Sequence, residues 1–212
     1  AGNITISNAA TNHSRSVVKH LMKNTYRIEN DKLIKGKSLP VFIHNLNYHL
    51  TDIHIYEDGK IDCWELVDFD GFVKKIKSGW IKTNLPKGEK VFAFPLGNFE
   101  MKEFYANRTE NDLIKEVRDI IDRFQGKKTT EQYCVDAYKE YVTNPTSENK
   151  KELKRTYELV AEHNRRFLLG DMDVDDLPIQ VAIYGEKIFK ESHKAKIQEK
   201  LIREYHLKGI KI

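Results

Sequence analysis

The chain has 212 residues and a formal net charge of +4, with 40% hydrophobic, 10% aromatic and 32% charged residues. That length and that share of hydrophobic and aromatic residues are enough for a buried core, which excludes an intrinsically disordered chain. The chain has no apolar run long enough to cross a bilayer and no apolar signal segment near its start. This favours a cytoplasmic protein that does not enter a membrane.

Residues 1–24 are predicted to be a flexible lead-in followed by a short helix. Residues 25–106 carry short apolar runs separated by Gly, Pro, Asn and Asp, a pattern that predicts a β-rich domain with a mostly antiparallel sheet. Asn30-Asp31 is predicted to form a turn between two of its strands. One short helix is expected inside this domain, over residues 72–77.

From residue 107 the apolar residues recur at intervals of three and four, so residues 107–212 are predicted to form an α-helical domain. Thr109 followed by Asp112 resembles a capping box at the start of the first helix. Four helices are expected, and they begin at Thr109, Thr130, Thr146 and Asp176. The third is expected to run to Gly170 and the fourth through Leu201. The fold class is therefore predicted to be α+β, with a mostly antiparallel β-sheet region followed by an α-helical region.

Asp58-Gly59 is typical of a two-residue type I′ turn, in which both central residues take a positive φ. Such a turn joins two strands within residues 48–67 and sets their register by counting outward. Asp52 then faces Glu65, and one face of the hairpin carries the side chains of Asp52, His54, Tyr56, Cys63 and Glu65. The opposite face is predicted to be core, formed by Ile53, Ile55, Trp64 and Leu66.

Two facing carboxylates repel, so Asp52 opposite Glu65 needs a cation, a metal ion, a raised pKa or water to offset the repulsion. Two carboxylates and a histidine can bind a divalent ion that activates water, which makes Asp52, His54 and Glu65 candidate metal ligands. Together with Cys63 they are the candidate catalytic residues if the protein is an enzyme. The simpler interpretation is the exposed polar face of a half-buried sheet, for which no cofactor is expected.

A second polar cluster spans the end of the third predicted helix and the segment after it, and its candidate binding residues are Glu162, His163, Arg165, Arg166, Asp171 and Asp173. A calcium loop of the EF-hand type is excluded, because the required central Gly and the Glu at position twelve are missing. A magnesium site would need only two carboxylates and water. In the structural alternative, Asp175 or Asp176 caps the next helix, and Asp171 or Asp173 pairs with one of the two arginines.

Two segments, CWELVDFDGF (residues 63–72) and RRFLLGDMDVDDLPIQVAIYG (residues 165–185), resemble segments of uncharacterised bacterial proteins made of domains of unknown function. The resemblance implies a bacterial, soluble protein built from two parts. It brings no catalytic residues to this sequence.

Three functions are compatible with these patterns. The chain lacks GxSxG, P-loop, HExxH and GxGxxG motifs, which favours a non-enzymatic protein-interaction module with a protein partner, for instance a toxin-neutralising or defence-accessory protein. The alternative is a metal-dependent hydrolase or nuclease that uses Asp52, His54 and Glu65. Nucleic-acid binding through the basic residues 186–212 ranks third, because the sequence shows no aromatic platform beside basic residues on the sheet.

Overall fold

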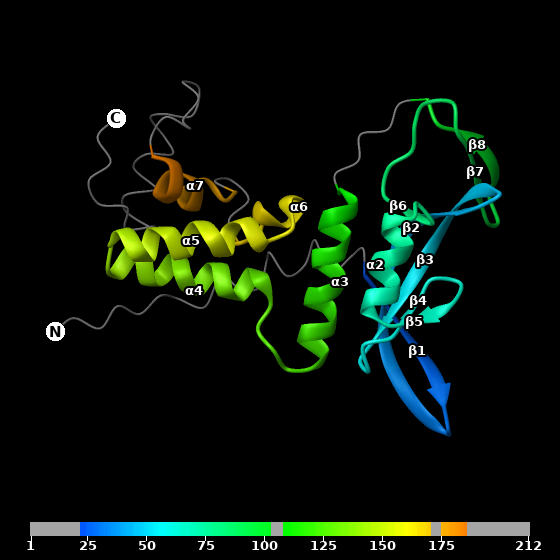
Figure 1. Ribbon diagram of the computed structural model, residues 1–212, viewed down its shortest axis with the longest axis horizontal. Coiled ribbons are helices and arrows are strands. Elements are labelled where there is room, and N and C mark those ends of the chain that lie inside the picture. The colour runs from blue at the N-terminus through cyan, green and yellow to red at the C-terminus, as the bar shows by residue number, and fades with distance from the viewer. Residues whose placement is uncertain (1–21, 103–107, 171–174, 186–212) are drawn as a thin grey trace. The chain divides into compact units, whose positions relative to one another are not determined.

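The computed structural model describes residues 22–102, 108–170 and 175–185 (Figure 1). The strands are β1 (Lys23–Glu29), β2 (Lys32–Asn45), β3 (Asn47–Tyr56), β4 (Ile61–Asp62), β5 (Leu66–Val67), β6 (Ile81–Lys82), β7 (Lys90–Ala93) and β8 (Gly97–Glu100). The helices are α2 (Phe69–Lys77), α3 (Glu110–Phe124), α4 (Thr130–Thr143), α5 (Ser147–Leu159), α6 (Glu162–Arg165) and α7 (Leu177–Tyr184). The predicted α+β class is confirmed, with an antiparallel sheet region followed by helices. The predicted helix near the start of the chain lies mostly outside the described residues.

The chain divides into two compact units. The sheet unit holds the described residues up to Thr129 together with residues 161–163, and the helical unit holds the other described residues. The composition changes near residue 107, where the boundary was predicted, but the units divide after Thr129. The reason is that α3 contributes Leu113 and Val117 to the core of the sheet unit.

The sheet has the strand order β1-β2-β3-β4-β5, and every pair along this path is antiparallel. Two further connections leave that path: β6 pairs with β2, while β7 pairs with β3 in parallel and with β8 antiparallel. The turn between β1 and β2 is the predicted one, and both Asn30 and Asp31 have a positive φ. Glu29 faces Lys32 across it, so the loop has two residues, as expected for a type I′ turn.

The turn at Asp58-Gly59 has a different geometry from the predicted one. Gly59 has a φ of +84°, whereas Asp58 is not among the residues with positive φ. The Gly59 N–H donates to the Tyr56 carbonyl at 2.9 Å, and the Tyr56 N–H donates to the Lys60 carbonyl at 2.9 Å. These bonds close a three-residue loop whose last residue is the left-handed glycine, a common alternative to the two-residue turn.

The longer loop shifts the register of β3 and β4 by one residue, so the predicted register is wrong. His54 faces Asp62 rather than Cys63. Because side chains alternate between faces, a shift by one residue moves each side chain of one strand to the opposite face. Cys63 is therefore buried in the core, while Trp64 and Leu66, which were predicted to be core, are exposed.

Helices α2 and α3 cover one face of the sheet, as Figure 1 shows. The buried residues of this core are Leu39, Val41, Ile43, Ile53, Ile55, Ile61, Cys63, Phe72, Ile76, Ile81, Leu113, Val117, Ile120 and Ile121. The predicted core positions Ile53 and Ile55 are thus confirmed. Helix α2 begins earlier than predicted, because the Asp68 carboxylate accepts the N–H of Gly71 at 2.8 Å and caps it.

The start of α3 is the predicted capping box. The Asp112 N–H donates to Thr109 Oγ1 at 3.1 Å, and the Thr109 N–H donates to the Asp112 carboxylate at 3.2 Å. Aspartate thus replaces the usual glutamate at the third position of the box. The helix ends before Gly126, which has a φ of +70°, a left-handed conformation that is common just after a helix.

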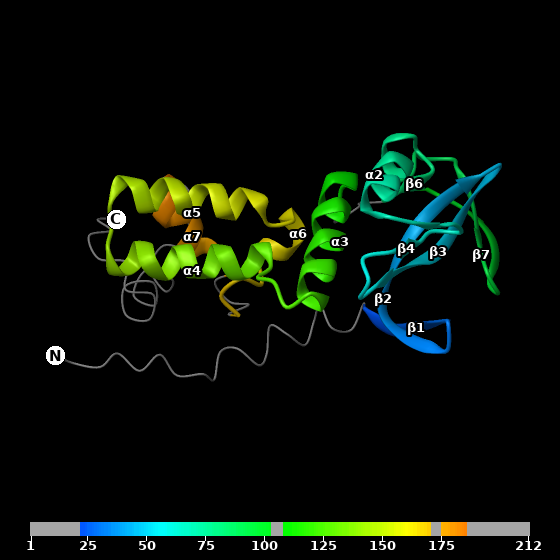
Figure 2. The same cartoon turned by 60° about the horizontal axis from the view of Figure 1, so that its bottom comes forward.

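In the helical unit, α4 and α5 run side by side in opposite directions (Figure 2). Thr146 caps α5 as predicted, but the helix ends at Leu159 instead of Gly170. Val160 takes an extended conformation, after which residues 161–163 join the sheet unit. Helix α7 also ends early, at Gly185, and the expected continuation through Leu201 lies outside the described residues. No helix within the described ranges is long and apolar enough to cross a bilayer.

Candidate functional site

The structure does not bring the two predicted hairpin carboxylates together. Asp52 Oδ2 lies 4.0 Å from Lys23 Nζ, and Glu65 Oε2 lies 2.8 Å from Lys75 Nζ. The β3–β4 ladder ends at His54, so no residue of β4 faces Asp52. In the part of the chain that the structure describes, no three His, Cys, Asp or Glu side chains are placed to hold a metal ion. The geometric argument for a metal site at Asp52, His54 and Glu65 therefore fails.

The other two members of the predicted site lie in different surroundings. His54 Nδ1 is 2.8 Å from the hydroxyl of Ser38, the residue it faces on β2. Cys63 is buried, and its thiol donates to the Glu65 carbonyl at 3.5 Å. Burial raises the pKa of the Cys63 thiol to about 11, although the nearby Lys75 charge opposes part of that rise. A buried thiol with a raised pKa is a core residue rather than a nucleophile.

Both cysteines are expected to resist alkylation by iodoacetamide in the folded protein at pH 8. Burial raises the pKa of the Cys134 thiol to about 12, as it raises that of Cys63, and only the thiolate reacts. In denaturant both thiols recover an ordinary pKa, so the labelling rate should rise by on the order of 100-fold. Mass spectrometry of the labelled chain with and without urea measures this, and rapid labelling of native Cys63 would contradict its burial.

A buried carboxylate on α3, which the sequence interpretation missed, organises part of the second predicted cluster. The Glu116 side chain is only 7% exposed, and Arg108 Nη1 donates to its Oε2 at 3.1 Å. His163 Nε2 lies 3.7 Å from the same oxygen. Burial alone raises the pKa of Glu116, but the nearby His163 imidazole and the Arg108 guanidinium outweigh it and hold that pKa below its usual value.

The sequence pattern around Glu116 indicates a buried carboxylate. It lies three residues after Leu113 and four before Ile120, inside the apolar stripe that faces the sheet. A carboxylate within such a stripe requires a partner when it is buried. Arg108 supplies that partner and also donates to the carbonyl of Pro40 in β2, so it ties α3 to the sheet.

The segment after α5 is held against the start of α3. The Glu162 N–H donates to Asp112 Oδ1 at 2.9 Å, and the other Asp112 oxygen accepts the Thr109 hydroxyl at 2.7 Å. Burial alone raises the pKa of Asp112, but these hydrogen bonds outweigh it and lower that pKa. Glu162 and His163, two of the predicted binding residues, therefore have structural contacts within the sheet unit.

The two predicted arginines lie in the helical unit. The Arg165 guanidinium lies 4.6 Å from the ring centre of Tyr157, and its Nε donates to the Val160 carbonyl at 3.3 Å. Arg166 Nη2 lies 3.4 Å from the carboxylate of Asp175. An arginine–aspartate pair thus exists, but with Asp175. Asp175 was predicted as a helix cap, and the predicted partners Asp171 and Asp173 lie outside the described residues.

Asp176 holds the position before α7, as expected for a cap, but its carboxylate makes other bonds. It accepts the Tyr157 hydroxyl at 2.5 Å and the Gln180 side-chain amide at 3.0 Å, and it caps no backbone N–H. Burial and the Asp176 charge both raise the pKa of Tyr157. This cluster joins α5 to α7.

A group of aromatic rings, of which Trp64 and Phe92 are exposed and His49 is half-buried, lies where the covered face of the sheet continues beyond its helices. His49 faces Ile43 on β2 and lies on the same face of β3 as the buried Ile53. On its other side His49 faces Phe92 of the parallel strand β7, with ring centres 5.7 Å apart. The Trp64 ring centre lies 4.9 Å from that of His49. We call His49, Trp64 and Phe92 the aromatic surface; Phe99 faces the buried Val91 and so lies on the opposite face of the sheet.

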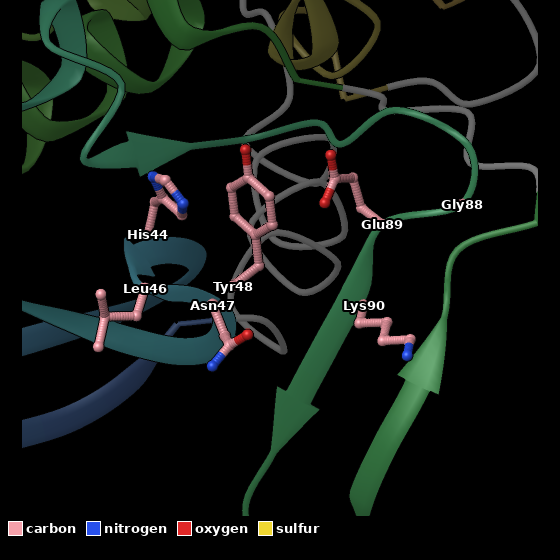
Figure 3. A pocket seen from close by; sticks show the side chains of 7 residues that line it. All are labelled: His44, Leu46, Asn47, Tyr48, Gly88, Glu89 and Lys90. Atoms are coloured by element: carbon pink, nitrogen blue, oxygen red, sulfur yellow. The ribbon is translucent and has the colours of Figure 1, made fainter.

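The aromatic surface contains a groove with a volume of about 650 Å³, lined by Asn47, His49, Lys90, Phe92, Asn98, Phe99 and Glu100. Beside it lies a smaller hollow of about 310 Å³, lined by His44, Leu46, Asn47, Tyr48, Gly88, Glu89 and Lys90 (Figure 3). Asn47 and Lys90 line both. The charged side chains that line the larger groove balance each other, since Lys90 of β7 faces Glu100 of β8.

Two hairpin turns next to this surface expose large apolar side chains. Phe94 and Leu96, in the turn between β7 and β8, are 85% and 87% exposed. Leu46, in the turn between β2 and β3, is almost fully exposed. The β2–β3 and β7–β8 hairpins thus present exposed aromatic and aliphatic side chains, at positions that the sequence interpretation did not identify.

Two family models match adjacent parts of the chain, each described as a domain of unknown function: DUF7638 over residues 24–128 and DUF7639 over residues 129–206. Their junction coincides with the end of the sheet unit at Thr129. No curated protein and no solved structure matches the chain. The prediction of a two-part protein made of domains of unknown function is confirmed. Its bacterial origin stays a prediction.

Proposed function

We propose that this protein is a non-enzymatic interaction module that binds a protein partner through the aromatic surface. One observation carries the proposal. Helices α2 and α3 cover Ile53 and Ile55, whereas Phe92, on the same sheet face beside the half-buried His49, is exposed. A sheet face that continues from a core into solvent with its aromatic side chains exposed is typical of an interface.

The composition of the surface supports a protein partner. Aromatic residues are enriched at the centres of protein interfaces, where they supply much of the binding energy. Trp64 and Phe92 are exposed aromatic anchors of this kind, and Asn47, Asn98 and Lys90 provide a polar rim around them. A groove beside the anchors gives a partner side chain a place to insert.

The balanced charge favours protein over nucleic acid. Nucleic-acid binding depends on an excess of Lys and Arg that neutralises phosphates. The groove has Lys90 opposite Glu100, and Glu89 lines the neighbouring hollow. A stoichiometric complex with one partner, as in a toxin-neutralising or defence-accessory protein of the cytoplasm, is the form that we expect the interaction to take.

Affinity purification of the tagged full chain from lysate of its source cells tests the proposal. The test variant combines Trp64→Ser and Phe92→Ser, the two exposed rings that contact His49. The matched control is Leu159→Ser in the helical unit, where the side chain is 43% exposed, close to the 37% of Phe92. Thermal unfolding of each variant confirms that it is folded.

We expect the wild type and the Leu159→Ser control to recover one protein in stoichiometric amount. The Trp64→Ser, Phe92→Ser variant should recover at least about tenfold less, as for loss of an interface anchor. Recovery of the same partner by this variant would show that the aromatic surface does not bind it. Failure of the wild type to recover any stoichiometric partner would contradict the proposal as a whole.

A further inference from the structure

Strand β1 is an edge strand with a regular, unprotected outer side. Within the described residues it pairs only with β2, through seven consecutive residue pairs from Lys23–Ser38 to Glu29–Lys32. It contains no proline or bulge, two of the features that protect an edge, although it carries the charged residues Lys23, Arg27 and Glu29. A strand of this kind offers its outer N–H and C=O groups to another strand.

The side chains of β1 fit such a role. Tyr26 and Ile28 lie on one face and are 62% and 68% exposed. Arg27 lies on the other face, against the Tyr56 ring at 5.0 Å, where it pairs with Asp58. The exposed face is therefore apolar, while the central cation is held by the sheet unit itself.

We propose that β1 pairs antiparallel with β1 of a second copy of this chain, about a two-fold axis at Tyr26. In this register Lys23 faces Glu29 of the second copy, and Glu29 faces its Lys23, so two opposite-charge pairs form. Tyr26 faces Tyr26 of the second copy. Cross-strand aromatic pairs and opposite-charge pairs both stabilise a sheet. The two copies then form one continuous sheet.

The charges also favour this register over the two registers whose two-fold axis lies one residue earlier or later. An axis at Thr25 would place Lys23 opposite Arg27, and an axis at Arg27 would place two arginines opposite each other. Like charges at facing positions are destabilising. Seven residue pairs make a smaller interface than stable dimers usually have, so we expect a dissociation constant between about 1 μM and about 1 mM.

Sedimentation equilibrium of the full chain across that concentration range tests the dimer. The variants Lys23→Glu and Glu29→Lys each replace two attractions in the dimer by two repulsions. Each should weaken dimerisation about tenfold. The exposed Lys87, far from β1 in the sequence, provides a matched charge reversal, and Lys87→Glu should leave the dissociation constant unchanged.

An equimolar mixture of the two variants distinguishes the proposed pairing from a general loss of charge or fold. In the mixed dimer each replaced residue faces a residue of opposite charge, so the mixture should associate as tightly as the wild type. A wild type that stays monomeric up to about 1 mM would overturn the proposal. A mixture no tighter than either variant alone, or a dimer insensitive to both reversals, would overturn it as well.

Discussion

The Phe72→Ala variant is expected to lose about 3–5 kcal/mol of the free energy of unfolding. Among the described residues of the sheet unit, Phe72 is the largest fully buried side chain, and it joins α2 to the sheet core. Truncation removes its apolar contacts and leaves a cavity that the packed neighbours, such as Ile53 and Ile76, can fill only in part.

Urea unfolding followed by circular dichroism measures this loss. Lys74→Ala on the same helix is the control, because Lys74 is exposed and its replacement should change stability by less than about 0.5 kcal/mol. A loss below about 1 kcal/mol for Phe72→Ala would mean that α2 does not close the core as described.

The Glu116→Gln variant is expected to lose about 2–3 kcal/mol at pH 7. Removing one partner of a fully buried ion pair costs about 3–5 kcal/mol. The expected value is lower because Arg108 and His163 keep some contact with solvent. Glutamine preserves the volume of the side chain, so the loss reports on its charge rather than on packing.

The Glu116 effect should depend on pH with a defined sign. Its pKa is lower in the folded protein than in the unfolded chain. Its carboxylate therefore stabilises the fold fully above the unfolded pKa of about 4.3, and this contribution disappears as the pH falls through the folded pKa. The gap in stability between wild type and Glu116→Gln should shrink below about pH 4. A gap that stays constant from pH 7 into the acid range would contradict the paired, ionised state of Glu116.

Local signals in the sequence predicted much of the fold. Thr109 and Asp112 form the expected capping box, Asn30-Asp31 forms the expected turn, and Thr146 caps the expected helix. Each of these features depends on residues within three or four positions of one another, so a single sequence suffices to recognise it.

The Asp58-Gly59 hairpin shows why register is harder to predict. Gly59 takes a left-handed conformation in a two-residue type I′ turn and also in the observed three-residue loop, so the dipeptide fits both. The observed loop places Cys63 in the core and leaves Trp64 outside it. The predicted pairing of Asp52 with Glu65 was wrong because the loop is one residue longer than predicted.

The aromatic surface depends on contacts between distant residues. His49 and Phe92 meet only because β7 pairs in parallel with β3, and no local pattern around either residue indicates this pairing. Glu116 and His163 meet only because the chain leaves the helix at Val160. Periodicity predicts which face of an element is apolar but not which element covers it.

Hydrogen–deuterium exchange of the full chain, free and in complex with the partner recovered by affinity purification, tests the proposed interaction most directly. We predict slower exchange in residues 46–50 and 90–100, which carry the aromatic surface and its neighbouring turns. Exchange in α4 and α5 should stay unchanged. Protection confined to the helical unit, with none in β7 and β8, would contradict binding through the aromatic surface.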